Sequence, residues 1–312
     1  MLQPPIRIGT RKSLLARTQS GWVQRRVALA LGAAEEDAEG VAPLTFISTE
    51  GDRVQDRRLL EIGGKALFTK EIEQALLERR IDLAVHSMKD VPAETPAGLV
   101  IAAIPEREDP RDAFISHVAG RLEDLPQGAC LGTASLRRQA QALAVRPDLL
   151  VVMLRGNVDT RLARLRNGDF DAIFLAAAGL NRLGLGEAIT SLLDPVAAPP
   201  APGQGALAIQ CRAEDAEAPW LASLNHAPTA LCVAAERGAL EALEGSCRTA
   251  VGAYARLTDA GLELVTEALT TDGAARWREA ATVPASATRE EAFAMGAEAG
   301  RKVKAAAGDR LA

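Results

Sequence analysis

Short apolar runs alternate with amphipathic stretches along the first part of the chain. Residues 6–10 and 44–47 have the length and composition of strands, and residues 14–27 between them have an apolar face of helical period. Apolar residues then recur every fourth position in residues 68–80, before a third short apolar run at 83–85. Strand–helix–strand–helix–strand predicts a parallel sheet covered by helices.

The same alternation restarts after residues 105–112, a charged connection bounded by prolines that predicts a domain boundary. Three more strands are predicted at 130–133, 150–154 and 172–175, and the first two lead into helices. A proline- and glycine-rich stretch at 195–205 predicts a hinge that returns the chain to its first module.

The last part of the chain has a different pattern. A helical pattern at 229–243 precedes alternating strands at 251–257, 262–270 and 277–283, and a final helix is predicted from Arg289. We therefore expect two βα domains and a small α+β domain. Their expected bounds are 1–105 with 206–222 for the first, 111–199 for the second and 227–312 for the third. Residues 35–40 are polar and acidic and are predicted to form a loop.

Composition narrows the class of protein. The 312 residues are 48% hydrophobic and 25% charged, as in a soluble globular protein. A net charge of −5 and only 3% aromatic residues argue against a nucleic-acid binder. No apolar run approaches about 20 residues and the first residues carry no signal sequence, so we expect a cytoplasmic protein with no membrane partner. The cysteines and histidines are scattered and predict no metal site.

Polar side chains follow the predicted strands abruptly. The apolar run at 83–85 leads directly to His86, Ser87, Lys89 and Asp90, and ligands of open α/β sheets bind outside the carboxyl ends of strands. Asp90 is the best catalytic candidate, because a carboxylate among cations stays ionised and can stabilise a positive intermediate or move a proton. Its alternative role is an ion pair or a helix cap. His86 is either a base or a hydrogen-bonded core residue.

Several arginines lie just after predicted strands or in the first turn of the next helix, and guanidinium groups there bind carboxylates or phosphates. They are Arg11, Arg137, Arg138, Arg155 and Arg161. Any one of them alone is better explained as a solvated surface arginine, whereas the set of five favours a cleft for a ligand with several negative charges. Residues 50–65 lack apolar periodicity and predict either a functional flap or disorder. Cys247 lies in a loop of small residues beside Arg248, which favours its thiolate, although an exposed loop cysteine is often inert.

Five motifs resemble those of the porphobilinogen deaminase family, in order and over nearly the whole chain. They are His86-Ser-Met-Lys-Asp-Val-Pro92, Glu108-Asp-Pro-Arg-Asp-Ala113, Gly132-Thr-Ala-Ser-Leu-Arg-Arg138, Leu154-Arg-Gly-Asn157 and Glu244-Gly-Ser-Cys247. The resemblance implies two α/β domains like those of periplasmic binding proteins around a cleft, plus the small C-terminal domain. It implies a monomer that joins four porphobilinogen molecules into hydroxymethylbilane, releasing ammonia, and a dipyrromethane cofactor held by a thioether to Cys247.

The same resemblance assigns roles to individual residues. Asp90 would be the catalytic carboxylate. The cofactor would be bound by Ser87, Lys89, Asp90, Thr133, Ser135, Arg137, Arg138, Arg155 and Cys247. The substrate porphobilinogen and the growing polypyrrole chain would be bound by Arg11, Ser13, Lys65, Phe68, Arg155, Arg161, Arg182 and Gln204. Residues 50–65 would form a lid.

The chain departs from the family pattern at five positions, and two other functions compete with this one. The departures are Ala66, Ala134, Gln210, Ser246 and Ala250, and none of them removes Asp90, the arginines or Cys247. One alternative is a non-catalytic two-domain protein that binds anions, for which the Cys247 loop has no use. The other is a transferase acting on phosphate ligands, which would carry no pyrrole adduct.

Overall fold

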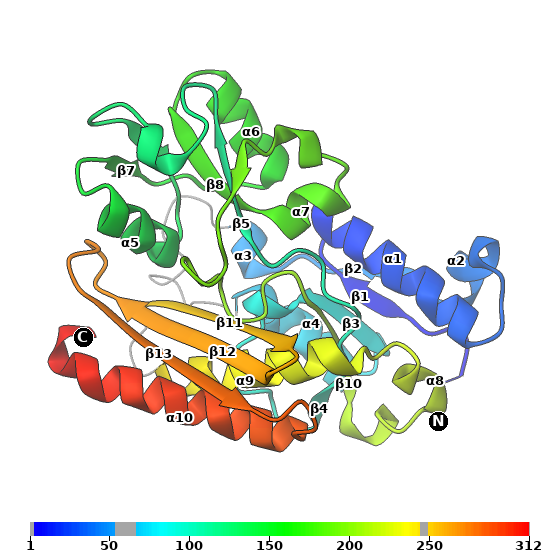
Figure 1. Ribbon diagram of the computed structural model, residues 1–312. Coiled ribbons are helices and arrows are strands. Elements are labelled where there is room, and N and C mark those ends of the chain that lie inside the picture. Colours follow the sequence, from blue (N-terminus) through cyan, green and yellow to red (C-terminus); the bar gives the residue numbers. More distant parts are fainter. Residues whose placement is uncertain (1–2, 54–66, 244–248, 312) are drawn as a thin grey trace. The chain divides into compact units, whose positions relative to one another are not determined.

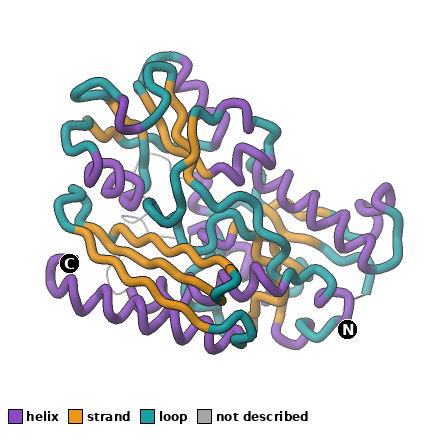
Figure 2. The backbone as a smooth tube through the Cα atoms, viewed as in Figure 1, coloured by secondary structure: helices purple, strands orange, loops and turns teal. Residues whose placement is uncertain are grey.

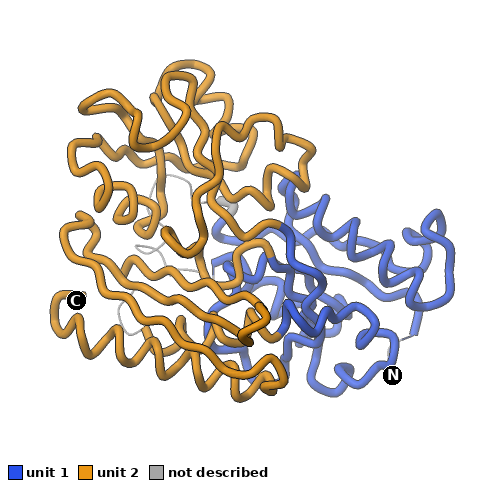
Figure 3. The backbone as a smooth tube through the Cα atoms, in the orientation of Figure 1, with its two compact units in different colours: residues 1–108, 206–230 blue, residues 109–205, 231–312 orange. Residues whose placement is uncertain are grey.

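The structure is a computed structural model, and it describes residues 3–53, 67–243 and 249–311. The chain forms two compact units, each built from two stretches of sequence (Figure 3). The first unit contains residues 1–108 and 206–230, and the second contains residues 109–205 and 231–312. Each unit contains a five-stranded sheet, and the second also contains a three-stranded sheet.

The sheet of the first unit is mixed. Its strands are Ile8–Thr10 (β1), Leu44–Phe46 (β2), Leu83–Ser87 (β3), Leu99–Ala103 (β4) and Leu207–Arg212 (β10). Their order is β2-β1-β3-β10-β4 (Figure 1). β1 pairs in parallel with β2 and β3, as predicted, but β10 runs antiparallel to β3 and β4.

Helices cover both faces of this sheet. The helices of this unit are Leu14–Ala30 (α1), Ala38–Val41 (α2), Glu50–Arg53 (α3), Lys70–Leu77 (α4) and Pro219–Ala222 (α8), of which α1, α4 and α8 pack on the sheet. On one face, Val23 and Val27 of α1 pack with Val85 and Ile209 of the sheet. On the other face, the buried residues of α4 pack against Ala84. The alternation of side chains along β3 and β10 therefore assigns alternate residues to the α1 side and the α4 side.

The second unit repeats this arrangement. Its sheet strands are Asp112–Ser116 (β5), Cys130–Gly132 (β6), Leu150–Val152 (β7), Ala172–Ala176 (β8) and Ser191–Leu192 (β9). The order is β7-β6-β8-β5-β9, with β6 parallel to both β7 and β8 and with β5 antiparallel to β8. The connecting helices are Leu136–Val145 (α5), Val158–Arg166 (α6) and Ala177–Arg182 (α7). The predicted pair of similar βα modules is confirmed.

The C-terminal part of the second unit is an antiparallel meander with helices. Its elements are Ala227–Leu243 (α9), Ala250–Thr258 (β11), Gly261–Leu269 (β12), Arg276–Val283 (β13) and Arg289–Ala307 (α10). Figure 2 shows α10 running along the three strands. A Cβ on Gly296 would lie 1.9 Å from the carbonyl oxygen of Ala235, so α9 and α10 can pack this closely because that position is glycine. The predicted α+β character is confirmed.

One secondary-structure prediction is wrong, and the parallel pairing predicted for the strands of residues 6–90 does not extend to every strand of the sheets. Residues 35–40 are not a loop but a 3-10 turn, Glu35–Asp37, followed by α2. The sheets are not purely parallel, because β10 and β5 run against their neighbours. Both strands follow proline-rich connections rather than helices, so the strand–helix rhythm does not reveal them. The predicted fold class is nevertheless confirmed in its α/β and α+β parts.

Candidate active site

The carboxyl ends of β1, β2 and β3 lie at one edge of the first unit's sheet, since the three strands are parallel. This edge carries four predicted site residues, which follow β1 or β3: Arg11, Ser13, Lys89 and Asp90. A fifth, Ser87, is the last residue of β3. The sheet therefore brings these residues of the first unit together, as the positions after the strands predict.

Asp90 lies in a 3-10 turn, Met88–Asp90, directly after β3. Met88 and Val91 are each only 1% exposed and anchor the turn in the core. The backbone N–H of Met88 donates to the carbonyl of Ala206, which ties the turn to the chain entering β10. Lys89 and Asp90 are half-buried beside these anchors. The turn thus presents a carboxylate and an ammonium group from a fixed backbone.

Arg11 and Phe68, two predicted substrate-binding residues, are in contact. The guanidinium of Arg11 lies over the ring of Phe68, 4.2 Å from its centroid, which is the geometry of a cation–π interaction. Ser13 caps α1, since its hydroxyl accepts a hydrogen bond from the N–H of Ala16. The hydroxyl of Ser87 lies 3.1 Å from the amide nitrogen of Gln19, a buried α1 residue that no sequence pattern singled out.

His86 is a buried residue of β3, and its exposed fraction is 6%. Its Nε2 lies 3.0 Å from the side-chain oxygen of Gln210 on β10. Burial lowers the pKa of His86 to about 4, although the hydrogen bond to Gln210 and the charge of Asp90 act to raise it. Of the two roles that the sequence left open, the structure favours a neutral, hydrogen-bonded core residue.

The second unit also gathers predicted site residues after its parallel strands. Ser135 caps α5 by accepting from the N–H of Arg138, and Thr133 accepts a hydrogen bond from the N–H of Ser135. Asn157 caps α6 in the same way, with Thr160 as the donor. Two more predicted residues donate to backbone carbonyls: Arg161 to Gly156 and Arg182 to Gly205, while Arg155 lies half-buried between β7 and α6. Helix N-termini and guanidinium groups make this edge suited to carboxylates.

Asp112 joins three predicted site residues, and sequence reasoning gave it no role. It is fully buried at the start of β5, opposite Ala176 at the end of β8. Its carboxylate accepts hydrogen bonds from Arg137 at 2.6 Å, from Arg138 at 2.7 Å and from Gln204 at 2.8 Å. Burial alone would raise the pKa of Asp112, but the two guanidinium groups hold it well below its usual value. The sequence signal that could have pointed to Asp112 is its place in the motif Glu108–Ala113.

The described cysteines are poor nucleophiles. Burial raises the pKa of the Cys211 thiol to about 11 and also raises the pKa of Cys130. Cys232 is buried in the α9 core. Lys65, Cys247 and most of the predicted lid, 50–65, lie outside the described residues, as do Ala66 and Ser246.

The described part of the chain has neither a metal site nor a membrane-spanning helix. Within it, no group of three or more histidine, cysteine or acidic side chains is arranged to hold a metal ion. Among the described helices, none combines the length and the apolar character needed to cross a membrane.

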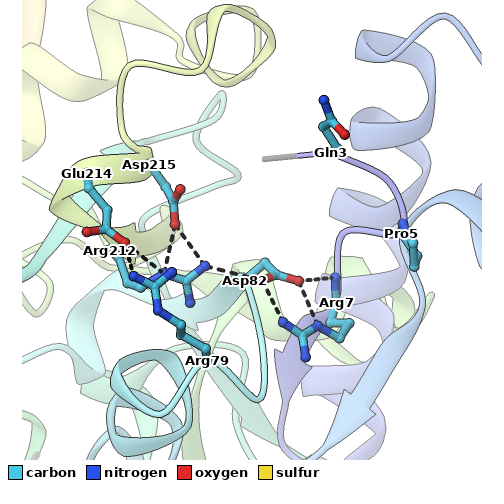
Figure 4. Close-up of a pocket in the computed structure, with 8 residues that line it drawn as sticks. All are labelled: Gln3, Pro5, Arg7, Arg79, Asp82, Arg212, Glu214 and Asp215. Carbon is cyan, nitrogen blue, oxygen red and sulfur yellow. Dashed lines mark hydrogen bonds and ion pairs between the residues drawn. The ribbon is translucent and has the colours of Figure 1, made fainter. Parts of the chain in front are cut away.

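A polar pocket of about 730 Å³ lies elsewhere in the first unit (Figure 4). Arg7 precedes β1 and Asp82 precedes β3, so this pocket lies at the amino ends of the strands, away from Asp90. Its charges pair with one another: Asp82 binds Arg7 and Arg212, and Arg212 also binds Asp215. Such mutual pairing is typical of an ion-pair cluster that joins strand ends, and we do not assign the pocket to the candidate site.

Comparison with known proteins agrees with the motifs. The family model described as "Porphobilinogen deaminase, dipyromethane cofactor binding domain" matches residues 6–219, and the model for the C-terminal domain of porphobilinogen deaminase matches residues 230–305. A porphobilinogen deaminase of Caulobacter vibrioides is 64% identical over 99% of this chain and 98% of that protein. One of Phenylobacterium zucineum is 61% identical, with the same coverage.

Solved structures include more distant likenesses. A periplasmic substrate-binding protein of an ABC transporter from Coxiella burnetii is 15% identical to this chain. The match covers 70% of this chain and 89% of that protein, with a TM-score of 0.43. The periplasmic aliphatic sulphonate binding protein of Escherichia coli is 14% identical. Its match covers 78% of this chain and 71% of that protein, with a TM-score of 0.41. Since two family models together span most of the chain and relatives above 60% identity cover nearly all of it, the chain belongs to the porphobilinogen deaminase family.

Proposed function

We propose that this protein is a hydroxymethylbilane synthase. It joins four porphobilinogen molecules head to tail, releases ammonia at each addition and supplies a linear tetrapyrrole for porphyrin biosynthesis. The observation that carries the proposal is the half-buried carboxylate of Asp90 on an anchored turn, in a chain with both domains of the family. Relatives named porphobilinogen deaminase, more than 60% identical to this chain, support the substrate.

Asp90 acts in this proposal as the catalytic carboxylate. A positively charged pyrrole nitrogen forms when ammonia leaves, and a fixed carboxylate stabilises that charge electrostatically. The same carboxylate can take up or return a proton at the reacting atoms. The buried anchors Met88 and Val91 support this role, because they fix the turn before substrate arrives.

The other candidate residues bind carboxylates. Porphobilinogen carries an acetate and a propionate, so every added unit brings two more negative charges that guanidinium groups and helix N-termini neutralise. We assign substrate and chain binding to Arg11, Ser13, Lys65, Phe68, Arg155, Arg161, Arg182 and Gln204. The contact between Arg11 and Phe68 supports this assignment in the first unit, since it holds one guanidinium plane in a defined orientation.

The residues of the second unit fit the dipyrromethane cofactor, whose acetate and propionate groups need donors. Thr133 and Ser135 lie at the N-terminus of α5, which adds backbone N–H groups to the donor set. The bonds of Arg137 to Asp112, Gln141 and the carbonyl of Pro199 all run from Nη1, and a guanidinium has five N–H donors. Asp112 would therefore orient Arg137 toward a ligand carboxylate while using donors of Nη1 alone.

The proposed cofactor-binding set also includes Ser87, Lys89 and Asp90 of the first unit and Arg155 of the second unit. We propose Cys247 as the covalent attachment point. The raised thiol pKa values of Cys130 and Cys211 and the burial of Cys232 support that choice over the described cysteines. When bound, the cofactor supplies two pyrrole rings with their carboxylates.

Three further features belong to this proposal. We propose three domains, of which the second and residues 231–312 of the third lie in one compact unit, and we propose residues 50–65 as a lid. We also propose a monomeric, cytoplasmic enzyme. Sedimentation equilibrium of the purified protein tests the monomer, and a mass twice that of the chain would contradict it.

The test of the proposed function is the intact mass of the denatured, freshly purified protein, with peptide mapping around Cys247. An excess mass of two linked pyrrole units on Cys247 is the expected result. A bare chain would be incubated with porphobilinogen and measured again. If neither an adduct nor a tetrapyrrole then forms, the synthase is ruled out and the anion-binding alternative is favoured.

A further inference from the structure

A chain of three buried polar side chains runs through the core of the first unit to the turn that carries Asp90. It consists of Glu73 on α4, Gln210 on β10 and His86 on β3, with exposed fractions of 7%, 0% and 6%. The amide nitrogen of Gln210 lies 3.1 Å from a carboxyl oxygen of Glu73, and its oxygen lies 3.0 Å from Nε2 of His86. None of the catalytic or binding roles in the proposed function depends on these contacts.

The register of β3 and β10, neighbouring strands in Figure 1, explains how these side chains meet. Ala208 pairs with His86 and Ala84 pairs with Gln210, so all four side chains lie on the face that α4 covers. The two alanines leave room for the diagonal contact between the long side chains, since such neighbours lie within reach across an antiparallel pair.

The chemistry of the chain fixes where the protons lie. A carboxylate only accepts hydrogen bonds, so Glu73 requires the NH₂ group of Gln210 to face it. The oxygen of Gln210 then faces His86 and can only accept, so Nε2 of His86 must carry its proton. A neutral imidazole has one N–H, which leaves Nδ1 as an unprotonated nitrogen.

We propose that Gln210 is a positioning residue: held in one orientation by Glu73, it fixes the proton of His86 on Nε2, at the base of the turn that carries Asp90. This inference rests on the proposed function, because its effect on catalysis acts through Asp90. Among the described residues, the charged groups near His86 are Asp90 and Arg11, whose charges shift its pKa in opposite directions, and Glu73 beyond Gln210. An uncharged His86 leaves the negative charge of Asp90 available to a positive pyrrole nitrogen, whereas an imidazolium would offset it.

The protonation state can be read directly by long-range ¹H–¹⁵N correlation spectra of the ¹⁵N-labelled, cofactor-loaded enzyme. The chain has three histidines, so the variants His117→Gln and His226→Gln assign the His86 signals. We expect one tautomer, protonated on Nε2, from about pH 5.5 to about pH 8. A proton on Nδ1, or an imidazolium near pH 7, would overturn the proposal.

Glu73→Gln tests whether Glu73 sets the orientation. An amide at position 73 can donate as well as accept, so the Gln210 amide can turn over and present its NH₂ group to His86. We expect a second population of His86 with its proton on Nδ1, at nearly unchanged packing. A spectrum identical to that of the unmodified enzyme would show that Glu73 does not orient Gln210.

The exchange variant Glu73→Gln/Gln210→Glu tests the link to catalysis. It conserves one glutamate, one glutamine and the net charge but exchanges their positions. The carboxylate then lies next to His86 and raises the pKa of the imidazole. We expect kcat to fall about tenfold per pH unit below that raised pKa, where the unmodified enzyme shows no such ionisation. A folded exchange variant with an unchanged pH profile would overturn the role in catalysis.

The two proposals fail separately. If Asp90→Asn kept normal activity, the role of Asp90 would be lost, but the tautomer of His86 would stand. If His86 had the other tautomer, Gln210 would lose its role, while the mass of the Cys247 adduct and the effect of Asp90→Asn would be unaffected.

Discussion

Asp90 is one carboxylate on a turn whose neighbours Met88 and Val91 are buried. Because these buried neighbours hold the turn, we expect Asp90→Asn to fold normally while kcat falls by about 10²–10⁴-fold, the usual contribution of a positioned proton-transfer group. Turnover of porphobilinogen and thermal unfolding of the same sample measure the two effects. Asp37→Asn, an exposed position in the same unit, is the matched control and should keep full activity. Near-normal activity in Asp90→Asn would remove this residue from its role.

His86 makes stability depend on pH. Its pKa is about 4 in the folded protein and about 6.5 when unfolded, so between these values the unfolded chain binds the extra proton. Stability should therefore be complete above about pH 6.5 and fall by up to about 3 kcal/mol as the pH drops toward 4. Urea unfolding across this range measures the loss, and His86→Gln should flatten the curve. An equally steep curve in that variant would contradict the assignment to His86.

For single residues, the sequence predicted where site residues lie along the chain better than it predicted which side chains they contact. Asp90 and Arg11 could be selected because they follow apolar strand residues, and that local pattern survives in the fold. Asp112 could not be given its role, because the contacts with Arg137 and Gln204 join residues far apart in the chain. From the sequence, Gln210 was only a departure from the family pattern. Its contacts with His86 and Glu73 could be assigned only from the structure.

At the scale of elements, periodicity predicted the strands that lead into helices and the alternating strands of the C-terminal meander, but it missed β5 and β10, which follow proline-rich connections. β1, β3, β6 and β8 were found with their directions, since each belongs to a strand–helix repeat. β10 has six buried residues and lies beside β3, yet its antiparallel direction depends on where the returning chain enters the sheet. Hydrophobic pattern does not encode that entry point, because buried strands look alike in either direction.

Asp112 links β5, α5 and the turn around Gln204, so its removal should affect all three elements. Asp112→Asn leaves two buried guanidinium groups without their counter-charge, and breaking a buried pair in this way costs about 3–5 kcal/mol. We expect a lower free energy of unfolding and weaker retention of the dipyrromethane cofactor. Urea unfolding and the fraction of cofactor-loaded protein by intact mass check the two results.

The matched control is Asp169→Asn, which breaks a solvent-exposed pair with Arg164. Surface pairs contribute about 1 kcal/mol or less, so this variant should stay close to the unmodified protein. Equal losses of stability in the two variants would show that Asp112 is not the buried centre we describe.

At the scale of the whole molecule, an acidic protein must bind a product that gains negative charge at every step. The net charge of −5 repels such a chain at long range, so binding must come from local guanidinium groups. Arg155 stands between β7 and α6, where it is half-buried, and we assign it to the growing chain. A charge-assisted hydrogen bond to a carboxylate contributes about 1.5–3 kcal/mol, so its loss should matter more as the polypyrrole lengthens.

Arg155→Leu should therefore slow elongation about tenfold or more and leave partly elongated polypyrrole chains on the enzyme. Intact-mass spectra after brief mixing with porphobilinogen would show these chains as a ladder, next to the turnover rate from ammonia release. Arg166→Leu removes an exposed guanidinium at the end of the next helix, α6, and should change neither the ladder nor the rate. If both variants elongate as fast as the unmodified enzyme, the carboxylates of the growing chain do not depend on Arg155. If both stall alike, the effect comes from the lost net charge and not from a specific site.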